Sequence, residues 1–124
     1  MRIEEIATEV VKTFIENRMS GIIIDHNNCI AVQTVGTSDG GNVIFAITSS
    51  IINVVYYNSN TKKSQSIAIV NSHDPDVPGQ LKEIIGVVKD DYEDKVCQWP
   101  ELPSGYESFE PSDWWKYGAA PDSM

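Results

Sequence analysis

The sequence predicts an α+β domain: a five-stranded, mainly antiparallel sheet flanked by N-terminal and C-terminal helices, with an aromatic C-terminal tail. Three observations predict this class. Apolar residues recur at helical spacing near the start of the chain and again after residue 76. Between these segments, short apolar runs rich in β-branched residues are separated by turn-forming residues. A chain of 124 residues has the usual size of one domain, so a single core is expected.

The first expected element is a helix from Ile3 to Arg18. Its apolar residues fall on one face and its glutamates on the opposite face, as in an amphipathic helix that packs on a core. Gly21 is expected to mark the end of the helix. Arg18 places a cation near the partial negative charge of the last carbonyl groups.

Five strands are expected next, at residues 21–25, 29–35, 42–48, 51–57 and 64–70. Their short connections favour antiparallel hairpins, and Ser49-Ser50 fits either a tight turn or a bulge. Alternation predicts a core face made of Ile30, Val32, Val43, Phe45, Ile47, Ile52, Val54, Tyr56, Ile67 and Ile69. The second face collects mostly smaller groups, namely Cys29, Ala31, Ile44, Ala46, Thr48, Ile51, Val55, Ser66 and Ala68. Such a face is usually covered by the chain's own tail, a symmetry mate or a partner.

A second helix is expected after this sheet. Asp74 and Pro75 are suited to the N-cap and the first helical position, although Pro78 and Gly79 delay the regular turns to about Gln80. Its apolar stripe consists of Leu81, Ile84, Ile85, Val88, Tyr92 and Val96. This order of elements resembles profilin-like layouts, a resemblance of architecture that implies nothing about function.

The chain is expected to divide into an α+β domain at residues 1–98 and a tail at residues 99–124. The tail contains four of the six prolines, which exclude a long regular helix. It is also rich in aromatic residues, and disordered segments are normally poor in them. We therefore expect the tail to dock, either on its own domain or on a partner.

Charge is distributed unequally along the chain. Residues 1–72 contain six acids and five bases, whereas residues 73–124 contain twelve acids and four lysines. A small protein with such an acidic region attracts basic surfaces. We therefore expect a protein-binding inhibitor and not an enzyme, of the toxin-immunity or phage anti-defence type, that occludes a basic, nucleic-acid-handling protein. The candidate partner-binding residues are Asp90, Asp91, Glu93, Asp94, Trp99, Glu101, Glu107, Glu110, Trp114, Trp115 and Tyr117.

Three alternatives remain open. One is a nucleic-acid mimic whose carboxylates imitate phosphates, and another is a self-assembling component that forms a homodimer through the second sheet face. The third is a small metal-dependent or hydrolytic enzyme. In an up-and-down sheet, the candidate residues of such a site would lie at the same end of the sheet. These residues are Asp25, His26, Ser49, Ser50, His73, Asp74 and Asp76. The stretch from Gly36 to Gly40 matches a G-x-S-x-G pattern around Ser38, but a strand follows it where that motif needs a helix.

Other classes lack their sequence signals. There is no phosphate-binding glycine loop and no basic stripe, so neither a cofactor nor direct nucleic-acid binding is expected. No apolar run approaches the roughly 20 residues that span a bilayer, and the N-terminus lacks the pattern of a signal peptide. Cys29 and Cys97 are too few for a disulfide framework and lack metal-ligand spacing. The expected location is the cytoplasm, without membrane or metal binding.

Overall fold

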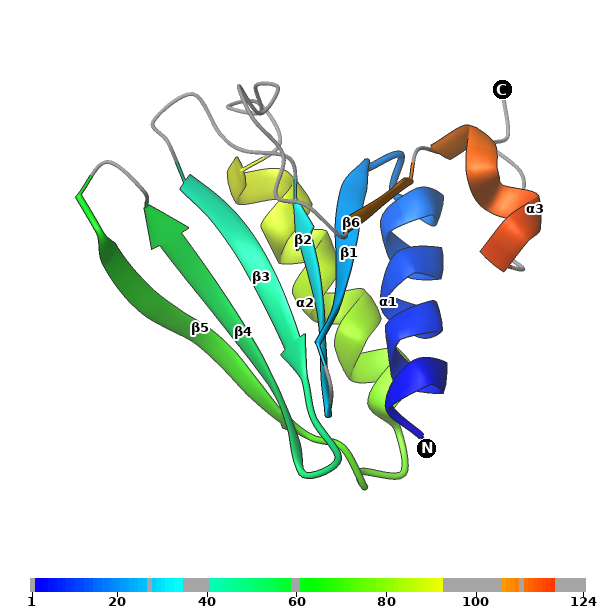
Figure 1. Cartoon of the computed structure of the whole chain (residues 1–124), viewed down its shortest axis with the longest axis horizontal. Helices are drawn as coiled ribbons and strands as arrows, with labels where there is room; N and C mark the ends of the chain where they lie inside the picture. The colour runs from blue at the N-terminus through cyan, green and yellow to red at the C-terminus, as the bar shows by residue number, and fades with distance from the viewer. Residues whose placement is uncertain are drawn as a thin grey trace.

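The computed structural model describes residues 2–26, 28–34, 41–58, 61–92, 106–109 and 111–117. Within these ranges the description leaves out the side chains of His26, Lys89, Asp90, Asp91, Tyr92, Tyr106, Ser108, Pro111 and Trp114. The elements are α1 (Ile3–Glu16), β1 (Gly21–His26), β2 (Cys29–Thr34), β3 (Gly41–Ile47), β4 (Ile51–Asn58), β5 (Lys63–Asn71), α2 (Val77–Tyr92), β6 (Tyr106–Phe109), η2 (Pro111–Asp113) and α3 (Trp114–Tyr117). One layer is the sheet and the other contains α1 and α2 (Figure 1).

The strands form one antiparallel sheet in the order β5-β4-β3-β2-β1-β6. All five predicted strands are present, which confirms the α+β class and the up-and-down arrangement of β1 to β5. Ser49 and Ser50 form a turn and not a bulge. Thr48 Oγ1 accepts hydrogen bonds from the backbone N–H groups of Ser50 at 3.3 Å and Ile51 at 3.2 Å.

A sixth strand, β6, comes from the predicted tail and was not expected as a strand. It pairs with β1, with Phe109 opposite Gly21 and Tyr106 opposite Ile24. The segment has only four residues, and so short a run carries little period-two signal. The predicted boundary between residues 98 and 99 lies outside the described residues.

The face of the sheet that α1 and α2 cover, here called the inner face, carries the core. Nearly all of the predicted core-face residues are buried there or pack against the buried cluster. Ile69 is the exception, since it lies on the opposite, outer face and its exposed fraction is 63%. A register shift between Val54 and Val55 changes the alternation of β5, so that Ala68 pairs with Val54 and contacts the core. Placing Ile69 in the core and Ala68 outside it was therefore wrong.

Helix α1 packs a fully apolar stripe onto the inner face, with Ile6, Val10 and Phe14 each at 0% exposure. Its first turn is closed by Glu5 Oε1, which accepts a hydrogen bond from the Arg2 backbone N–H at 3.2 Å. The helix ends before Arg18, whose φ of 61° is left-handed and lets the Met19 N–H reach the Phe14 carbonyl at 2.8 Å. Gly21 is instead the first residue of β1.

The N-cap of helix α2 lies two residues later than the predicted cap at Asp74, and the helix begins at Val77, so the expected delay to about Gln80 was wrong. Asp76 Oδ1 accepts a hydrogen bond from the Gly79 N–H at 3.3 Å, which makes Asp76 the N-cap. Asp74 instead closes the preceding turn by accepting from the Asp76 N–H at 2.8 Å. The expected apolar stripe is confirmed where it is described, because Leu81, Ile85 and Val88 are fully buried. No helix in the described ranges is long and apolar enough to cross a membrane.

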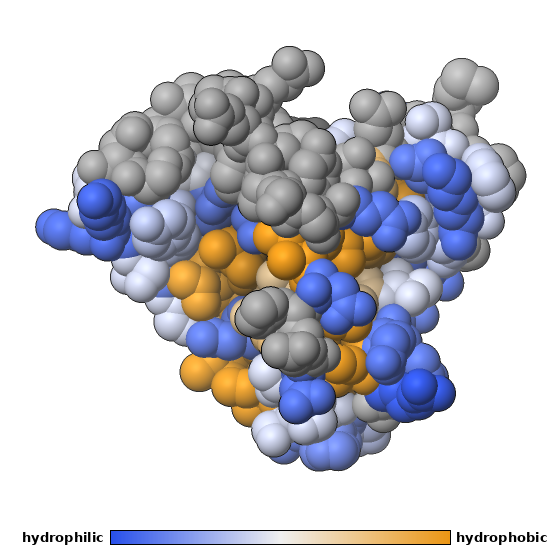
Figure 2. Space-filling view, in the orientation of Figure 1, coloured by the Kyte–Doolittle hydropathy of each residue, from blue (hydrophilic) through white to orange (hydrophobic). Residues whose placement is uncertain are grey.

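The outer face is only partly covered. In Figure 1 α2 lies behind the sheet, so Figure 2 looks onto the outer face and shows hydrophobic atoms near its centre. Three large side chains stay substantially exposed here: Ile51 at 40%, Tyr57 at 36% and Ile69 at 63%. Asn53 lies between Ala46 and Ile69, and its buried Oδ1 has no hydrogen-bond partner among the described residues. The half of this face formed by β3, β4 and β5 thus combines exposed apolar side chains with uncharged polar ones.

Candidate functional site

A groove of about 190 Å³ lies between α1 and the β1–β6 edge of the sheet. We call it the acidic groove. Its floor is apolar and consists of Ala7, Val11, Ile23 and Ile30. Its rim is polar and consists of Glu4, Thr8, Asp25, Glu107 and Tyr117. Three carboxylates therefore surround an apolar floor.

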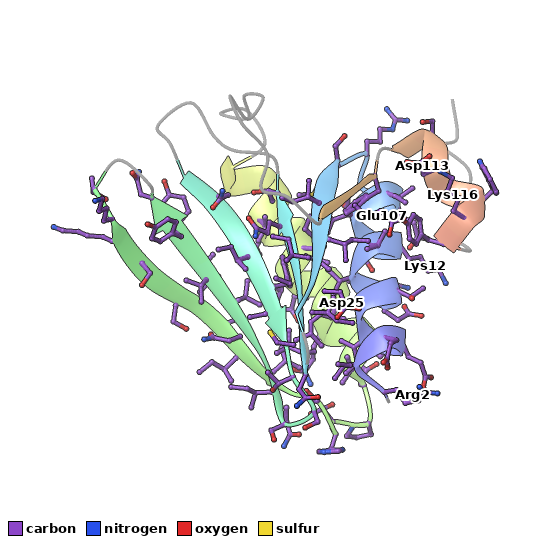
Figure 3. The ribbon with its side chains drawn as sticks, in the orientation of Figure 1. Arg2, Lys12, Asp25, Glu107, Asp113 and Lys116 are labelled. Atoms are coloured by element: carbon purple, nitrogen blue, oxygen red, sulfur yellow. The ribbon has the colours of Figure 1, made fainter. Side chains whose placement is uncertain are left out.

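Each rim carboxylate comes from a different element. Glu4 lies in the first turn of α1, Asp25 near the end of β1, and Glu107 in β6. Glu107 pairs with Ile23, and Asp25 follows two residues further along β1, so their side chains share the inner face as diagonal neighbours. Figure 3 shows Asp25 and Glu107 beside α1. The pairing of β6 with β1 is what brings Glu107 to this rim.

The rim carboxylates are poorly neutralised by the described residues. Arg2 Nε lies 3.7 Å from Glu4 Oε2, but both side chains are exposed, so this ion pair contributes little. Within the described ranges, neither Asp25 nor Glu107 forms an ion pair with a base. Like charges on one face repel each other, and a bound cation relieves that repulsion. The groove therefore has a negative electrostatic character.

Tyr117 closes one end of the groove. Its hydroxyl donates a hydrogen bond to Glu107 Oε1 at 3.3 Å. Burial, together with the negative charge and hydrogen bond of Glu107, raises the pKa of Tyr117 to about 12. Because the hydroxyl stays protonated at neutral pH, it remains a hydrogen-bond donor to the Glu107 carboxylate.

A chain of aromatic rings holds Tyr117 and β6 in place. Phe109 is 1% exposed, and its ring packs edge to face against Phe14 at 5.8 Å and Tyr117 at 6.1 Å. Phe14 in turn contacts Phe45 at 5.4 Å, which connects the groove to the centre of the core. Such edge-to-face pairs are favourable beyond their burial. The groove wall is thus fixed to the core by packing.

Helix α3 presents a large exposed ring next to this wall. Trp115 is 64% exposed, and Lys116 Nζ lies 5.5 Å from the centre of its ring, within range of a cation–π contact. Lys116 also lies 3.4 Å from Asp113 Oδ1. The exposed indole is therefore available for contact with a partner.

The structure describes only part of the predicted partner-binding set. Glu107 and Tyr117 line the acidic groove, and Trp115 lies two residues before Tyr117 in α3. The remaining members are described by backbone alone or lie outside the described residues: Asp90, Asp91, Glu93, Asp94, Trp99, Glu101, Glu110 and Trp114. Sequence reasoning missed Glu4 and assigned Asp25 only to the metal alternative. Only the pairing of β6 with β1 brings Glu107 close to Glu4 and Asp25, and no local sequence pattern indicates that pairing.

The predicted metal or acid–base cluster at one end of the sheet is not assembled among the described residues. Three or more His, Cys, Asp or Glu side chains suited to one metal ion do not occur together there. Asp74 and Asp76 are engaged in the turn and the N-cap, and Asp25 lines the acidic groove. His73 is exposed, and the side chain of His26 lies outside the described residues. Free Cys29 is half-buried.

The G-x-S-x-G stretch, including Ser38, also lies outside the described residues. The strands on either side of it, β2 and β3, pair with each other as a hairpin. A nucleophile elbow joins a strand to a helix, and here the connection joins two strands, as the sequence predicts.

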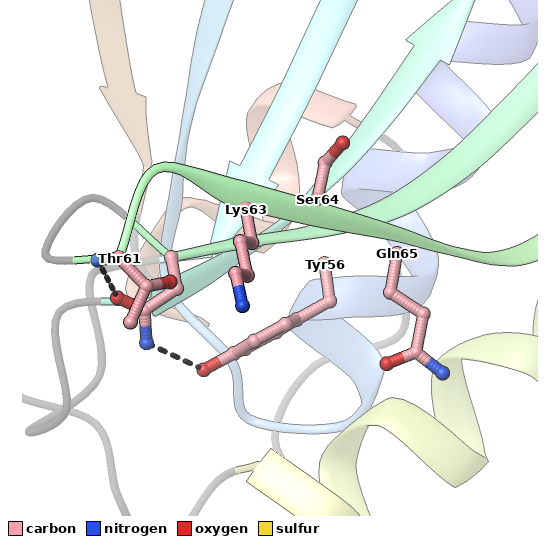
Figure 4. Close-up of a pocket in the computed structure, with 6 residues that line it drawn as sticks. Tyr56, Thr61, Lys63, Ser64 and Gln65 are labelled. Atoms are coloured by element: carbon pink, nitrogen blue, oxygen red, sulfur yellow. Dashed lines mark hydrogen bonds between the residues drawn. The ribbon is translucent and has the colours of Figure 1, made fainter.

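A second cavity, of about 540 Å³, lies at the β4–β5 hairpin and differs from the groove in charge. Its lining consists of Tyr56, Asn58, Thr61, Lys63, Ser64 and Gln65. Asn58 Nδ2 donates to the Tyr56 hydroxyl at 3.4 Å, and Figure 4 shows Lys63 beside these groups. None of these lining residues is acidic. The groove at the β1–β6 edge is therefore acidic, whereas the cavity at the β4–β5 hairpin contains a lysine and no acid.

Comparisons with protein-family models, with curated proteins and with solved structures found no match for this chain.

Proposed function

We propose that this chain is a cytoplasmic, non-enzymatic binding protein that inhibits a basic, nucleic-acid-handling protein by holding a cationic segment of it in the acidic groove. The toxin-immunity and phage anti-defence classes fit this description. One observation carries the proposal: Glu4, Asp25 and Glu107 surround an apolar floor, and Asp25 and Glu107 form no ion pair with a described base.

The groove matches the chemistry of lysine and arginine side chains. Both have an apolar stem and a charged head, so the stem fits an apolar floor while the head reaches a carboxylate. Hydrogen bonds between a charged head and a carboxylate are about twice as strong as neutral ones. Trp115, at 64% exposure on α3, offers an additional aromatic contact surface.

The overall charge supports fast capture of such a partner. The net charge is −9, and residues 73–124 contribute −8 of it, from twelve acids and four lysines. Excess charge of one sign raises the association rate with an oppositely charged surface, and added salt weakens the effect. The cytoplasmic location is supported by the scarcity of cysteine and by the free thiol of Cys29.

A titration with two short peptides tests the proposal. One probe alternates lysine and leucine, and the control probe has glutamate at every lysine position. We expect only the lysine probe to bind, with chemical-shift changes at Val11, Ile23 and Tyr117 and with weaker binding in high salt. Binding of both probes, or shifts confined to other surfaces, would show that the groove is not a cation site.

Charge reversal identifies the residues responsible. Glu107→Lys should weaken binding of the lysine probe by about tenfold or more, because one charge-assisted hydrogen bond is lost and a repulsive charge is added. Glu83→Lys is the matched control, since Glu83 is exposed on α2 and lies outside the groove lining. Equal weakening by both variants would indicate that only net charge matters and would contradict a defined groove.

A further inference from the structure

The edge of the sheet opposite the acidic groove is an open strand. Among the described strands, β5 is the last in the sheet order and pairs only with β4. It is nine residues long, contains no proline, and most of its residues are exposed. In Figure 1 no described element lies beyond it. A long strand edge has unpaired backbone donors and acceptors that can pair with another strand.

The charge pattern along this edge is self-complementary. Residues 40–73 contain no aspartate or glutamate, although the whole chain has eighteen acids. Lys62 and Lys63 stand at the start of β5, and Asp74 follows three residues after its end. One end of the strand is therefore basic and the other acidic. When two such strands pair antiparallel, the basic end of each meets the acidic end of the other.

We propose that two copies of this chain associate through β5, antiparallel, about a two-fold axis near Ile67. With the two strands centred near Ile67, the end of β5 that carries Lys62 and Lys63 in one chain lies beside the end that precedes Asp74 in the second copy. The two sheets then form one continuous sheet. A two-fold contact of this kind is closed, so the association stops at a dimer.

The apolar groups of the edge also favour this contact. Ile69 is 63% exposed on β5, and Ile51 on the neighbouring β4 is 40% exposed. Pairing two β5 strands brings Ile69 next to the second copy and covers part of its surface, while backbone groups on both edges gain hydrogen bonds. Because the region contains no acid, the repulsion between two chains of net charge −9 is smallest here.

This proposal is independent of the acidic groove. The groove lies at the β1–β6 edge, and β5 is at the opposite end of the sheet order. A dimer through β5 thus leaves both grooves open. A partner with two basic segments would gain affinity from binding both.

Sedimentation equilibrium of the full chain, from low micromolar to millimolar concentration, tests the dimer. We expect the average mass to rise with concentration to twice the chain mass and no further. Ile69→Lys should raise the dimer dissociation constant by about tenfold or more, because it replaces an apolar side chain at the contact with a charged one. Val87→Lys is the matched control, since Val87 is 50% exposed on α2, and it should leave the dissociation constant unchanged. A monomer at every concentration, or equal effects of both variants, would overturn the proposal.

A mixing experiment tests the charge arrangement. Lys63→Glu alone and Asp74→Lys alone should each weaken self-association, because both ends of the contact then carry like charges. A mixture of the two variants should form a heterodimer, since each end again pairs opposite charges. Failure of the mixture to associate while the unaltered chain dimerises would overturn the antiparallel arrangement.

Asp74→Lys also removes the hydrogen bond by which Asp74 closes its turn. A second measurement therefore uses the unaltered chain. Hydrogen exchange of the β5 amides should slow as protein concentration rises, whereas exchange in α1 should not. Exchange of β5 that is independent of concentration would equally overturn the proposal.

Discussion

The two edges of the sheet differ in almost every property that governs recognition. The β1 edge is extended by β6, a strand of four residues that adds Glu107 to an acidic rim and Phe109 to the core. The β5 edge has nine residues, is largely exposed and lies in a region without acids. The β1 edge, here called the closed edge because β6 covers it, is acidic, whereas the β5 edge is open and contains lysines but no acid.

The difference shows how one sheet can offer two separate surfaces. At the β1 edge, buried aromatic packing fixes the position of the carboxylates, so the charge is held on a rigid wall. At the β5 edge, the proposed contact with a second copy would use the backbone as its main recognition element. A basic partner and a second copy of the chain would therefore not compete for the same site.

The most destructive change at the closed edge is Phe109→Ala. Phe109 is 1% exposed and contacts Phe14 and Tyr117, so its loss should lower the free energy of unfolding by about 3–5 kcal/mol. Urea denaturation followed by circular dichroism measures this. Trp115→Ala, at a ring that is 64% exposed, should change it by less than about 0.5 kcal/mol. Similar losses for both variants would mean that Phe109 does not anchor β6.

Two glycine substitutions should change the free energy of unfolding by smaller amounts, and in opposite directions. At Gly21 an added Cβ would lie 2.5 Å from the Gln33 carbonyl oxygen and 2.7 Å from Phe109 Cζ. Gly21→Ala should therefore displace β6 and lower the free energy of unfolding by about 1–3 kcal/mol. At Gly86, inside α2, an added Cβ meets nothing within 4 Å, so Gly86→Ala should raise stability by about 0.5–1 kcal/mol. Thermal denaturation measures the change in stability of each variant. A change of the same sign in both would mean that the contact of β6 with Gly21 is unimportant.

The smallest expected effect is a pH dependence that belongs to the closed edge. The pKa of Tyr117 is raised from 10.0 to about 12 in the folded chain. The stability that it contributes is complete below pH 10 and is lost as pH rises through about 12, because only the protonated hydroxyl is favoured in the fold. Tyr117→Phe should flatten this loss in urea denaturation between pH 9 and 12. Glu107→Gln should reduce it by removing one of its causes, and an identical profile in all three proteins would exclude Tyr117 as its source.

Part of the candidate site was predictable from the sequence. Glu107, Trp115 and Tyr117 were identified because acidic and aromatic residues in a proline-rich tail are unusual. Glu4 and Asp25 were not linked to them, because residues more than eighty positions apart come together only when β6 pairs with β1. Ile69 was assigned to the wrong face because period-two alternation assumes an unbroken register, and β5 contains a shift.

By itself the sequence determined the elements whose signals are local: helix α1, the strands β1 to β5 and the apolar stripe of α2. Each follows from a period of 3.6 or 2 within a short window, and burial of the apolar face stabilises the element once formed. Only the tertiary structure decided the sixth strand, the face of Ile69 and the grouping of three carboxylates around one groove. These depend on contacts between distant segments, and the free energy of such contacts comes from the packing of Phe109, Phe14 and Tyr117, which no local pattern contains.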